Sequence, residues 1–366
     1  MVYLGTMRIL FLSRSTLWSQ VGGDTIQVEQ TAQALREKGH QIEIILSGQN
    51  VSGNYDLVHF FNLGRPQDAL PYLQNIDIPW VTSTLWVDYS SSDSRRTGIL
   101  GTVLKRLSPS GQEYLKSLAR GIMGRDQIPH FSYLIKGHTN TMRQIILRSK
   151  ALICSTQTEG KRIETHFKST PPIHTVSLGI SDVFWNTKKH NTSTPRSGVI
   201  CVGRFEVLKN QKTLISVLAK NNIPALFVGS GSGLQGNYYQ ECLKAAEGTP
   251  IRFVDHVSQG ELSKLYQGAK TVVIPSFFET FGLSGIEGLA SGCTLAVSNT
   301  LDSFEEYQRL GAETFSPDSP AEMEKALRAS LSKFTDTKDR LRKSKYTWSH
   351  AANELESIYK KVLKTE

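Results

Sequence analysis

The sequence predicts an α/β protein made of two domains, each built on a parallel β-sheet. Short apolar runs rich in β-branched residues alternate with segments of helical length along the chain. This alternation starts at Arg8, is interrupted by a polar stretch over residues 186–197, and starts again at Gly198. The 366 residues suffice for two hydrophobic cores. We therefore place a domain boundary in the polar stretch.

Composition indicates a protein of the reducing cytoplasm. Apolar residues make up 39% of the chain and charged residues 20%, as in ordinary soluble proteins. No apolar stretch has the length of a membrane span, and the short apolar core at the start of the chain fits a first strand better than a signal peptide. The cysteines form no CxxC pair and predict neither a zinc site nor a disulfide framework. They are Cys154, Cys201, Cys242 and Cys293.

The first half contains six apolar runs that predict strands. They cover residues 8–12, 41–46, 55–61, 80–84, 151–154 and 173–178. Asp24 or Thr25 is the expected cap of the first helix, and further helices are expected over residues 138–147 and 158–167. Gly22 and Gly23 precede the first helix. They indicate either a tight turn or a backbone segment that approaches a phosphate or sugar closely.

A basic segment at residues 89–148 is expected to be an insertion. Between Tyr89 and Lys150 the sequence has eleven Lys or Arg residues and three acidic residues. Short amphipathic helices are expected over residues 99–107 and 114–123. Two interpretations stay open, an anionic membrane surface or a solvated face over an ordinary core helix. The segment lacks interleaved aromatic residues, so we expect no nucleic-acid partner.

The second half repeats the pattern, with strands expected over residues 199–202, 225–228, 251–254 and 271–274. Arg204 and Lys209 lie on either side of a short turn after the first of these strands. Two cations there would hold a diphosphate and stabilise it as a leaving group, and the alternative is a pair of surface cations. The glycine-rich stretch 229–233 matches no phosphate loop and indicates a turn.

A strand–loop–helix unit ends at Gly292. Its helix is expected to begin at Leu283, directly after Gly282, and to end at Gly292. A helix N-terminus offers free amides and a positive dipole end for an anion. Glu279 lies in the loop before these amides and Glu287 just over one turn into the helix. A diphosphate flanked by two sugars would suit this arrangement.

The two glutamates, with Phe281 and Gly282 between them, resemble the donor-site motif of retaining GT-B glycosyltransferases, the family-4 type (glycosyl transferases group 1). The resemblance implies two Rossmann-like domains that face a central cleft. It also implies that Glu279 contacts the transferred sugar and that Glu287 binds the nucleotide ribose. The remaining residues for which it implies donor contacts are Gly22, Gly23, Arg204, Lys209, His256, Phe281, Gly282, Leu283 and Ser284.

One position departs from the family pattern. After the strand at residues 80–84 the family often has a histidine that faces the reacting sugar, and here Trp86 takes its place. His59 and Asp88 are the candidate substitutes. Because a lone histidine in an apolar strand is more often a core residue, both interpretations of His59 stay open.

We therefore predict a retaining glycosyltransferase that uses Glu279, Arg204 and Lys209 as catalytic residues. The donor is a UDP- or GDP-sugar, and the acceptor is a glycan or lipid-linked molecule of surface polysaccharide or glycoconjugate synthesis. No D-x-D motif follows an apolar strand, so we expect neither a metal nor another cofactor. The enzyme would be cytoplasmic, or peripheral at the inner face of the membrane through residues 89–148.

The expected domains are 1–185 for the acceptor, 186–345 for the donor, and a helix over 346–366 that crosses back to the first. Two alternatives remain. A glycosidase would need its carboxyl groups about 5 Å or about 6.5–9.5 Å apart, and the loop-and-helix spacing of Glu279 and Glu287 disfavours the shorter distance. A catalytically inactive GT-B protein that binds a nucleotide-sugar or glycan is the other, suggested by Trp86.

Overall fold

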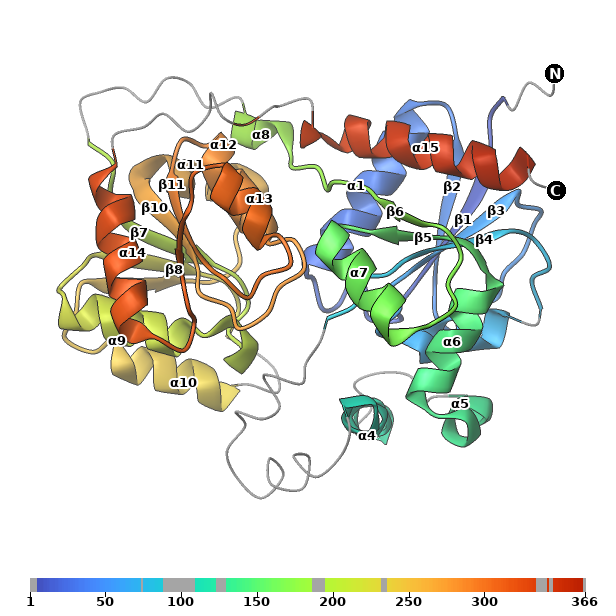
Figure 1. Ribbon diagram of the computed structural model, residues 1–366, viewed down its shortest axis with the longest axis horizontal. Helices are drawn as coiled ribbons and strands as arrows, with labels where there is room; N and C mark the ends of the chain where they lie inside the picture. The colour runs from blue at the N-terminus through green and yellow to red at the C-terminus, as the bar shows by residue number, and fades with distance from the viewer. Residues whose placement is uncertain are drawn as a thin grey trace. The chain divides into compact units, whose positions relative to one another are not determined.

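The computed structural model describes residues 5–73, 75–87, 109–122, 130–185, 195–231, 236–333, 341 and 345–364. These residues form two compact units (Figure 1). Unit 1 holds the described residues up to Gly179 and those from Trp348 onward, and unit 2 holds those from Ile180 to Thr347. Each unit has a six-stranded parallel sheet. The predicted α/β class with two parallel sheets is confirmed.

Unit 1 has the strand order β2-β1-β3-β4-β5-β6. Its strands are β1 (Arg8–Ser13), β2 (Gln41–Leu46), β3 (Leu57–Phe61), β4 (Trp80–Ser83), β5 (Ser149–Cys154) and β6 (Ile173–Thr175). Its helices are α1 (Gly23–Glu37), α4 (Pro109–Ile122), α5 (Phe131–Lys136), α6 (His138–Arg148), α7 (Gln157–His166) and α15 (Trp348–Lys364), with 3₁₀ turns η1 (Pro66–Asp68) and η2 (Leu70–Tyr72).

The core of unit 1 follows from the two-residue period of its strands. Leu10 and Leu12 of β1 and Val58 and Phe60 of β3 point to one side and pack with Ile145 of α6. All five residues of β3 are buried, as expected for a central parallel strand that is covered on both faces. The C-terminal helix α15 packs against α1 within this unit.

Unit 2 has the order β12-β11-β10-β7-β8-β9. Its strands are β7 (Ser197–Val202), β8 (Ala225–Val228), β9 (Ile251–Val254), β10 (Ala269–Ile274), β11 (Thr294–Ser298) and β12 (Glu313–Phe315). Its helices are α8 (Asp182–Trp185), α9 (Gln211–Lys220), α10 (Gly236–Ala245), α11 (Gln259–Gly268), α12 (Leu283–Ala290), α13 (Phe304–Arg309) and α14 (Pro320–Ser332), with the 3₁₀ turn η3 (Val207–Lys209).

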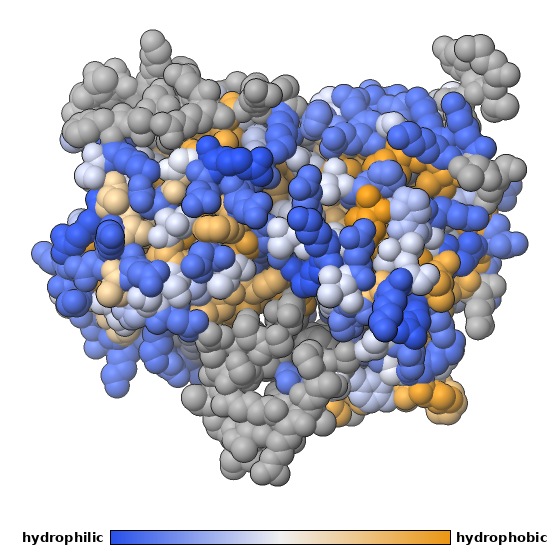
Figure 2. Space-filling view, viewed as in Figure 1, coloured by the Kyte–Doolittle hydropathy of each residue, from blue (hydrophilic) through white to orange (hydrophobic). Residues whose placement is uncertain are grey.

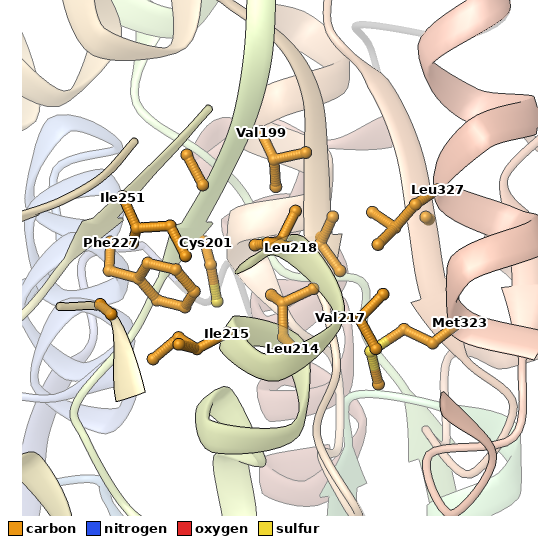
Figure 3. Close-up of a cluster of buried hydrophobic side chains, with 14 of the residues drawn as sticks. Val199, Cys201, Leu214, Ile215, Val217, Leu218, Phe227, Ile251, Met323 and Leu327 are labelled. Atoms are coloured by element: carbon orange, nitrogen blue, oxygen red, sulfur yellow. The ribbon is translucent and has the colours of Figure 1, made fainter. Parts of the chain in front are cut away.

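Two helices complete the core of unit 2 on one face of the sheet. Leu214 and Leu218 of α9 lie against Cys201 of β7 and Phe227 of β8, and Met323 of α14 packs in the same cluster (Figure 3). A core of this kind fixes the central strands β7 and β10. Their carboxyl ends carry the loops described below.

Two local predictions are corrected, and one helix was missed. The first helix begins at Gly23, with Gly22 as its N-cap, and not behind an Asp24 or Thr25 cap, because the Asp24 carboxylate is paired with Arg14 instead. The helix expected from residue 114 begins at Pro109. Helix α5 was not predicted, because it has only six residues and two of its apolar side chains face outward. The helix expected over residues 99–107 lies outside the described residues. Within the described ranges, no helix is both long enough and apolar enough to span a bilayer.

Candidate functional site

The site in unit 2 lies where the strand order reverses. The chain builds β7, β8 and β9 in one direction and then returns to place β10 on the other side of β7. Such a switch point separates the loops that follow the two central strands and is the usual ligand position of an open α/β sheet. The loop after β7 carries Arg204 and Lys209, and the loop after β10 carries Glu279.

The structure joins these two loops through an ion pair. Lys209 Nζ lies 2.8 Å from Glu279 Oε1, with both side chains about one-fifth exposed. Ser276 Oγ donates to the other carboxylate oxygen at 3.2 Å. Behind the pair, the buried Asn210 donates from Nδ2 to the Pro275 carbonyl oxygen at 3.1 Å. Two predicted catalytic residues, Lys209 and Glu279, are thus held together at the switch point.

Arg204 is placed differently. Its guanidinium is half exposed and pairs with Glu206 at 3.0 Å. The Arg204 carbonyl accepts a hydrogen bond from Gln211 Nε2 at 2.8 Å, which ties the loop to the start of α9. Arg204 therefore lies on the same loop as Lys209, with its charge turned toward solvent and toward a neighbouring carboxylate.

Helix α12 starts directly after this loop, and its first residue is Leu283 as predicted. Gly282 adopts a left-handed conformation with φ of 76°. A Cβ at this position would lie 3.2 Å from the Ile274 side chain. The amides of Leu283 and Ser284 occupy the first turn, where a helix has no internal acceptors for them. Glycine thus lets the chain turn abruptly and leaves these amides at a helix N-terminus, where an anion can bind.

Helix α13 clamps this loop, which sequence reasoning missed. The buried Tyr307 donates its hydroxyl to the Gly282 carbonyl, and Ser303 Oγ donates to the Phe281 carbonyl at 2.7 Å. The Asp302 amide donates to the Glu279 carbonyl at 2.9 Å. A Cβ on Gly285 would come within 2.7 Å of the Tyr307 ring. The only sign of this contact in the sequence was Gly285, a glycine inside a helix that the sequence alone does not explain.

We expect Tyr307→Phe to raise the KM for the donor by about fivefold to about a hundredfold. The change removes one hydrogen bond and leaves the Gly282 carbonyl without its partner, which costs about 1–3 kcal/mol. Because the clamp holds the amides that are predicted to bind the donor, steady-state kinetics should show the loss in donor KM. Tyr238→Phe is the matched control, because the Tyr238 hydroxyl also bonds one backbone group, the Lys212 amide. Equal effects of the two variants would show general loosening of the unit.

Glu287 lies one turn into α12 and is 7% exposed. The Tyr266 hydroxyl donates to Glu287 Oε2 at 3.1 Å. Burial raises the pKa of Glu287 to about 7, and the hydrogen bond from Tyr266 opposes this only in part. Burial also holds the pKa of Tyr266 well above its ordinary value, so its hydroxyl stays a donor. Glu287 is thus a buried carboxyl group that is half ionised near neutral pH.

His256 is not brought together with these residues. It is exposed and follows β9, the edge strand two places away from β7. Its amide bonds the carboxylate of Asp255 at 2.7 Å. The predicted base-binding role of His256 stays a prediction.

Gly22 and Gly23 lie in unit 1, at the start of α1 and beyond the end of β1. The nearly buried Arg14 organises this loop, with its guanidinium 2.6 Å from Asp24 and bonded to the Gln20 carbonyl at 2.7 Å. A Cβ at Gly23 would meet no atom within 4 Å. The space over Gly23 is therefore open, and the donor contact expected there stays a prediction. Arg14 was missed because nothing in the sequence shows that it folds back onto its own loop.

The structure decides between the two interpretations of His59. His59 is fully buried in β3, with Nδ1 2.5 Å from the Tyr359 hydroxyl and Nε2 2.8 Å from Ser83 Oγ. Its ring stacks on Phe61. Burial lowers the pKa of His59 to about 3, so it stays neutral. His59 is a core residue that joins β3 to α15. Asp88, the other candidate, lies outside the described residues.

Trp86 is fixed by a buried carboxylate. Glu159 accepts hydrogen bonds from the Trp86 amide at 2.9 Å and from Thr84 Oγ1 at 2.6 Å. Its second oxygen accepts from the Ser155 amide at 3.0 Å. The Arg162 guanidinium lies over the Trp86 ring at 5.4 Å. A tryptophan therefore fills the loop after β4 in a fixed backbone position.

Residues 184–348, most of unit 2, match the family model described as Glycosyl transferases group 1. An uncharacterised glycosyltransferase of Methanocaldococcus jannaschii is 24% identical over 317 residues, 76% of this chain and 77% of that protein. The D-inositol 3-phosphate glycosyltransferase of Corynebacterium glutamicum is 28% identical over 172 residues, 41% of each chain. This second match therefore spans about two-fifths of the length of the Corynebacterium protein.

Solved structures share the fold over nearly the whole chain. Sucrose-phosphate synthase from Thermosynechococcus elongatus superposes with a TM-score of 0.73 at 14% identity, covering 98% of this chain and 100% of that one. The Anabaena protein HepE, in complex with UDP and glucose, gives 0.67 at 14% identity and covers 97% and 99%. The chain therefore has the two-domain Rossmann-like GT-B fold, and the family match and relatives make it a transferase of the glycosyltransferase class.

Proposed function

We propose that this chain is a group 1 glycosyltransferase that takes a sugar from a nucleoside-diphosphate sugar bound in unit 2 and transfers it with retention of the anomeric configuration. The observation that carries the proposal is the Lys209–Glu279 pair beside the first amides of α12. Cationic, anionic and amide groups there meet at one switch point. The cation matches a diphosphate, the carboxylate matches a sugar hydroxyl, and the amides match further phosphate oxygens.

Each residue then has a role. The Leu283 and Ser284 amides and Lys209 hold the diphosphate, and Arg204 turns from Glu206 to join them. Glu279 binds the transferred sugar and Glu287 the ribose hydroxyls. The bond from the anomeric carbon to the phosphate oxygen breaks, and its electron pair stays on the phosphate. The acceptor oxygen bonds the same face, and its proton passes to the departing phosphate. Charge that develops on the phosphate is stabilised by Lys209 and the amides.

We further propose that UDP or GDP is the leaving group and that the two cations and the α12 amides stabilise its charge without a bound metal ion. The UDP complex of the structurally similar Anabaena protein supports a uridine donor. Full activity in the presence of EDTA is the expected result. Activity that returns only when a divalent cation is added would contradict the metal-free part of the proposal.

For the acceptor, we propose a glycan or lipid-linked molecule of surface polysaccharide or glycoconjugate synthesis, used by an enzyme that lies at the inner face of the membrane. The charge of residues 89–150, eleven basic against three acidic residues, supports this. A catalytically inactive binding protein is the alternative, because Trp86 stands where the resemblance places a histidine. Donor binding without any release of nucleoside diphosphate would favour that alternative.

A thermal-shift panel of UDP, GDP, ADP and CMP tests the donor site. A ligand at about 100 times its Kd adds roughly 2.7 kcal/mol of stability to the unit that binds it. We expect one diphosphate to raise the melting temperature by several degrees and a monophosphate to have little effect. The shift should disappear in Lys209→Ala and persist in Lys212→Ala, because Lys212 pairs with Glu241 on other helices. No shift with any nucleotide would contradict a preformed donor site.

A further inference from the structure

Helix α5 displays two large apolar side chains to solvent. Phe131 and Ile135 are each 71% exposed, the highest values among the large apolar residues of the described chain. They are four residues apart and therefore lie on the same face of the helix. The space-filling view shows an apolar patch at the lower right, where Figure 1 places α5 (Figure 2). Among the described residues of unit 1, no side chain covers this pair.

The opposite side of α5 is firmly anchored. Tyr133 is fully buried, and its hydroxyl lies 3.0 Å from His138 Nδ1 at the start of α6. Its ring stacks on Tyr114 of α4, and the Tyr114 hydroxyl donates to the Leu134 carbonyl at 2.9 Å. Because these contacts hold α5 on α4 and α6, Phe131 and Ile135 cannot rotate into the core. The outward position of the apolar pair is a stable property of the fold.

The charge around this pair is positive. Residues 131–150 contain four basic and no acidic side chains. Arg143 is exposed on α6, and Lys136 ends α5. Arg148 serves the fold instead, with bonds to the Ile76 and Ile78 carbonyls. Exposed apolar residues beside an excess of basic ones match a bilayer with anionic headgroups better than they match an acidic or purely apolar protein surface.

The position of α5 within unit 1 fits the same partner. Helix α6 leads without a linker into β5 and packs against β4 and β5, so it runs opposite to the strands. Its first residues, and α5 before them, therefore lie at the carboxyl edge of the sheet. That edge is where open α/β sheets bind their ligands. A bilayer against α5 would thus lie on the side from which a lipid-linked acceptor enters.

We propose that α5 is a membrane anchor that inserts Phe131 and Ile135 into the interfacial region of a bilayer rich in anionic phospholipid. This deepens the lipid-linked acceptor proposed above, but it needs no acceptor and no donor to be tested. Two inserted side chains give only weak, reversible attachment, and nearby basic residues strengthen it in a salt-sensitive way. Binding should therefore need both the apolar pair and anionic lipid.

Sedimentation with vesicles tests the anchor. At low salt we expect the protein to bind vesicles of phosphatidylcholine with 30% phosphatidylglycerol, and to bind pure phosphatidylcholine at least about tenfold more weakly. The double variant Phe131→Ser/Ile135→Ser should weaken binding to the anionic vesicles at least about tenfold. Leu147→Ser is the matched control. Leu147 is 63% exposed but lies nine residues into α6, about 14 Å along its axis.

A fluorescent label can report insertion directly. All four native cysteines are buried, and burial raises the pKa of the Cys242 and Cys293 thiols to about 12, so a thiol reagent should select a cysteine introduced on the surface. Ile135→Cys carrying an environment-sensitive dye should shift to the blue with anionic vesicles. Leu147→Cys with the same dye should not shift.

Three results would overturn the anchor. They are absence of vesicle binding at low salt, equal loss in the Leu147→Ser control, and concentration-dependent self-association that the double variant abolishes without any effect on vesicle binding. The donor proposal is checked separately in the same variants by the nucleotide-induced thermal shift. If the double variant loses vesicle binding but keeps the nucleotide-induced thermal shift, the anchor is supported. If the wild-type protein shows no thermal shift with any nucleotide, that result contradicts the donor site and not the anchor.

Discussion

Glu287→Gln is expected to make the protein more stable at pH 8 and, at the same time, to weaken donor binding about tenfold to a hundredfold. The carboxyl group is buried, and its pKa is raised from 4.5 to about 7 in the folded protein. Its ionisation at pH 8 therefore costs about 3 kcal/mol relative to the unfolded chain. Glutamine has nearly the same shape and can still accept the Tyr266 hydroxyl. The substitution removes the free-energy cost of ionising a buried carboxyl group, so the folded state gains stability. It also removes the charged acceptor for the ribose hydroxyls, so donor binding weakens.

The pH dependence has a definite sign. Between about pH 4.5 and 7 the folded state binds more protons at Glu287 than the unfolded state does. The contribution of this group to stability therefore falls as the pH rises through that window and levels off above it. Thermal unfolding of unit 2 should show the variant and the wild type alike near pH 4.5 and the variant several degrees more stable at pH 8. A stability loss at pH 8 would contradict the burial argument.

Donor affinity should change with pH in the opposite direction. At pH 6 only about one-tenth of Glu287 would be ionised, so a nucleotide-sugar should bind roughly tenfold more weakly than at pH 8. A nucleotide-sugar is the right probe, since its phosphates do not titrate in this range. Glu261→Gln serves as the control, because Glu261 is an exposed helix cap whose pKa is lowered by hydrogen bonds from Ser258. The control should leave donor affinity and its pH dependence unchanged.

The sequence predicted most of the fold because strand and helix periods are local. The run before Pro275 and the helix start at Leu283 depend on neighbouring residues only, and both lie where they were expected. Helix α5 was not predicted because it breaks the rule that large apolar side chains face the core. Phe131 and Ile135 are exposed, and Tyr133 is buried. Conflicts of this kind mark places where something other than folding selects the residue.

The candidate site was predicted only in part, because local sequence patterns show which loop a residue lies on but not which loops meet. Glu279 and Lys209 were chosen for the loops on which they lie, and their 2.8 Å contact arises because β7 and β10 are neighbours in the sheet. Pairing across 70 residues depends on strand order, which no local pattern contains. Tyr307 supports Gly282 from a helix 25 residues further along, and no local pattern contains this contact either. Both interpretations of His59 stayed open at the sequence level because its partner Tyr359 lies on α15, 300 residues further along.

Lys209→Ala is expected to lower kcat about a hundred- to a thousandfold. In the free enzyme the lysine neutralises Glu279, and with donor bound it would face the phosphate on which negative charge develops. Loss of one such charge-stabilising group costs about 2.7–4 kcal/mol in the transition state. The substitution also leaves the Glu279 carboxylate unpaired beside the diphosphate, which adds repulsion. Release of nucleoside diphosphate from the donor is a suitable readout, since it needs no identified acceptor.

A double-mutant cycle separates the catalytic role of Lys209 from its ion pair. If the pair only held the loops together, Lys209→Ala/Glu279→Ala would be no worse than either single variant, and Lys209→Arg would restore most of the rate. If Lys209 acts on phosphate and Glu279 on sugar, the double variant should be clearly worse than either single variant, although short of full additivity because Glu279→Ala also removes the repulsion. In that case Lys209→Arg should rescue only in part. Lys212→Ala, three residues along and paired with Glu241 at 2.7 Å, should keep wild-type kcat. Wild-type kcat in Lys209→Ala would remove this lysine from the reaction and leave the α12 amides as the remaining proposed support for the leaving group.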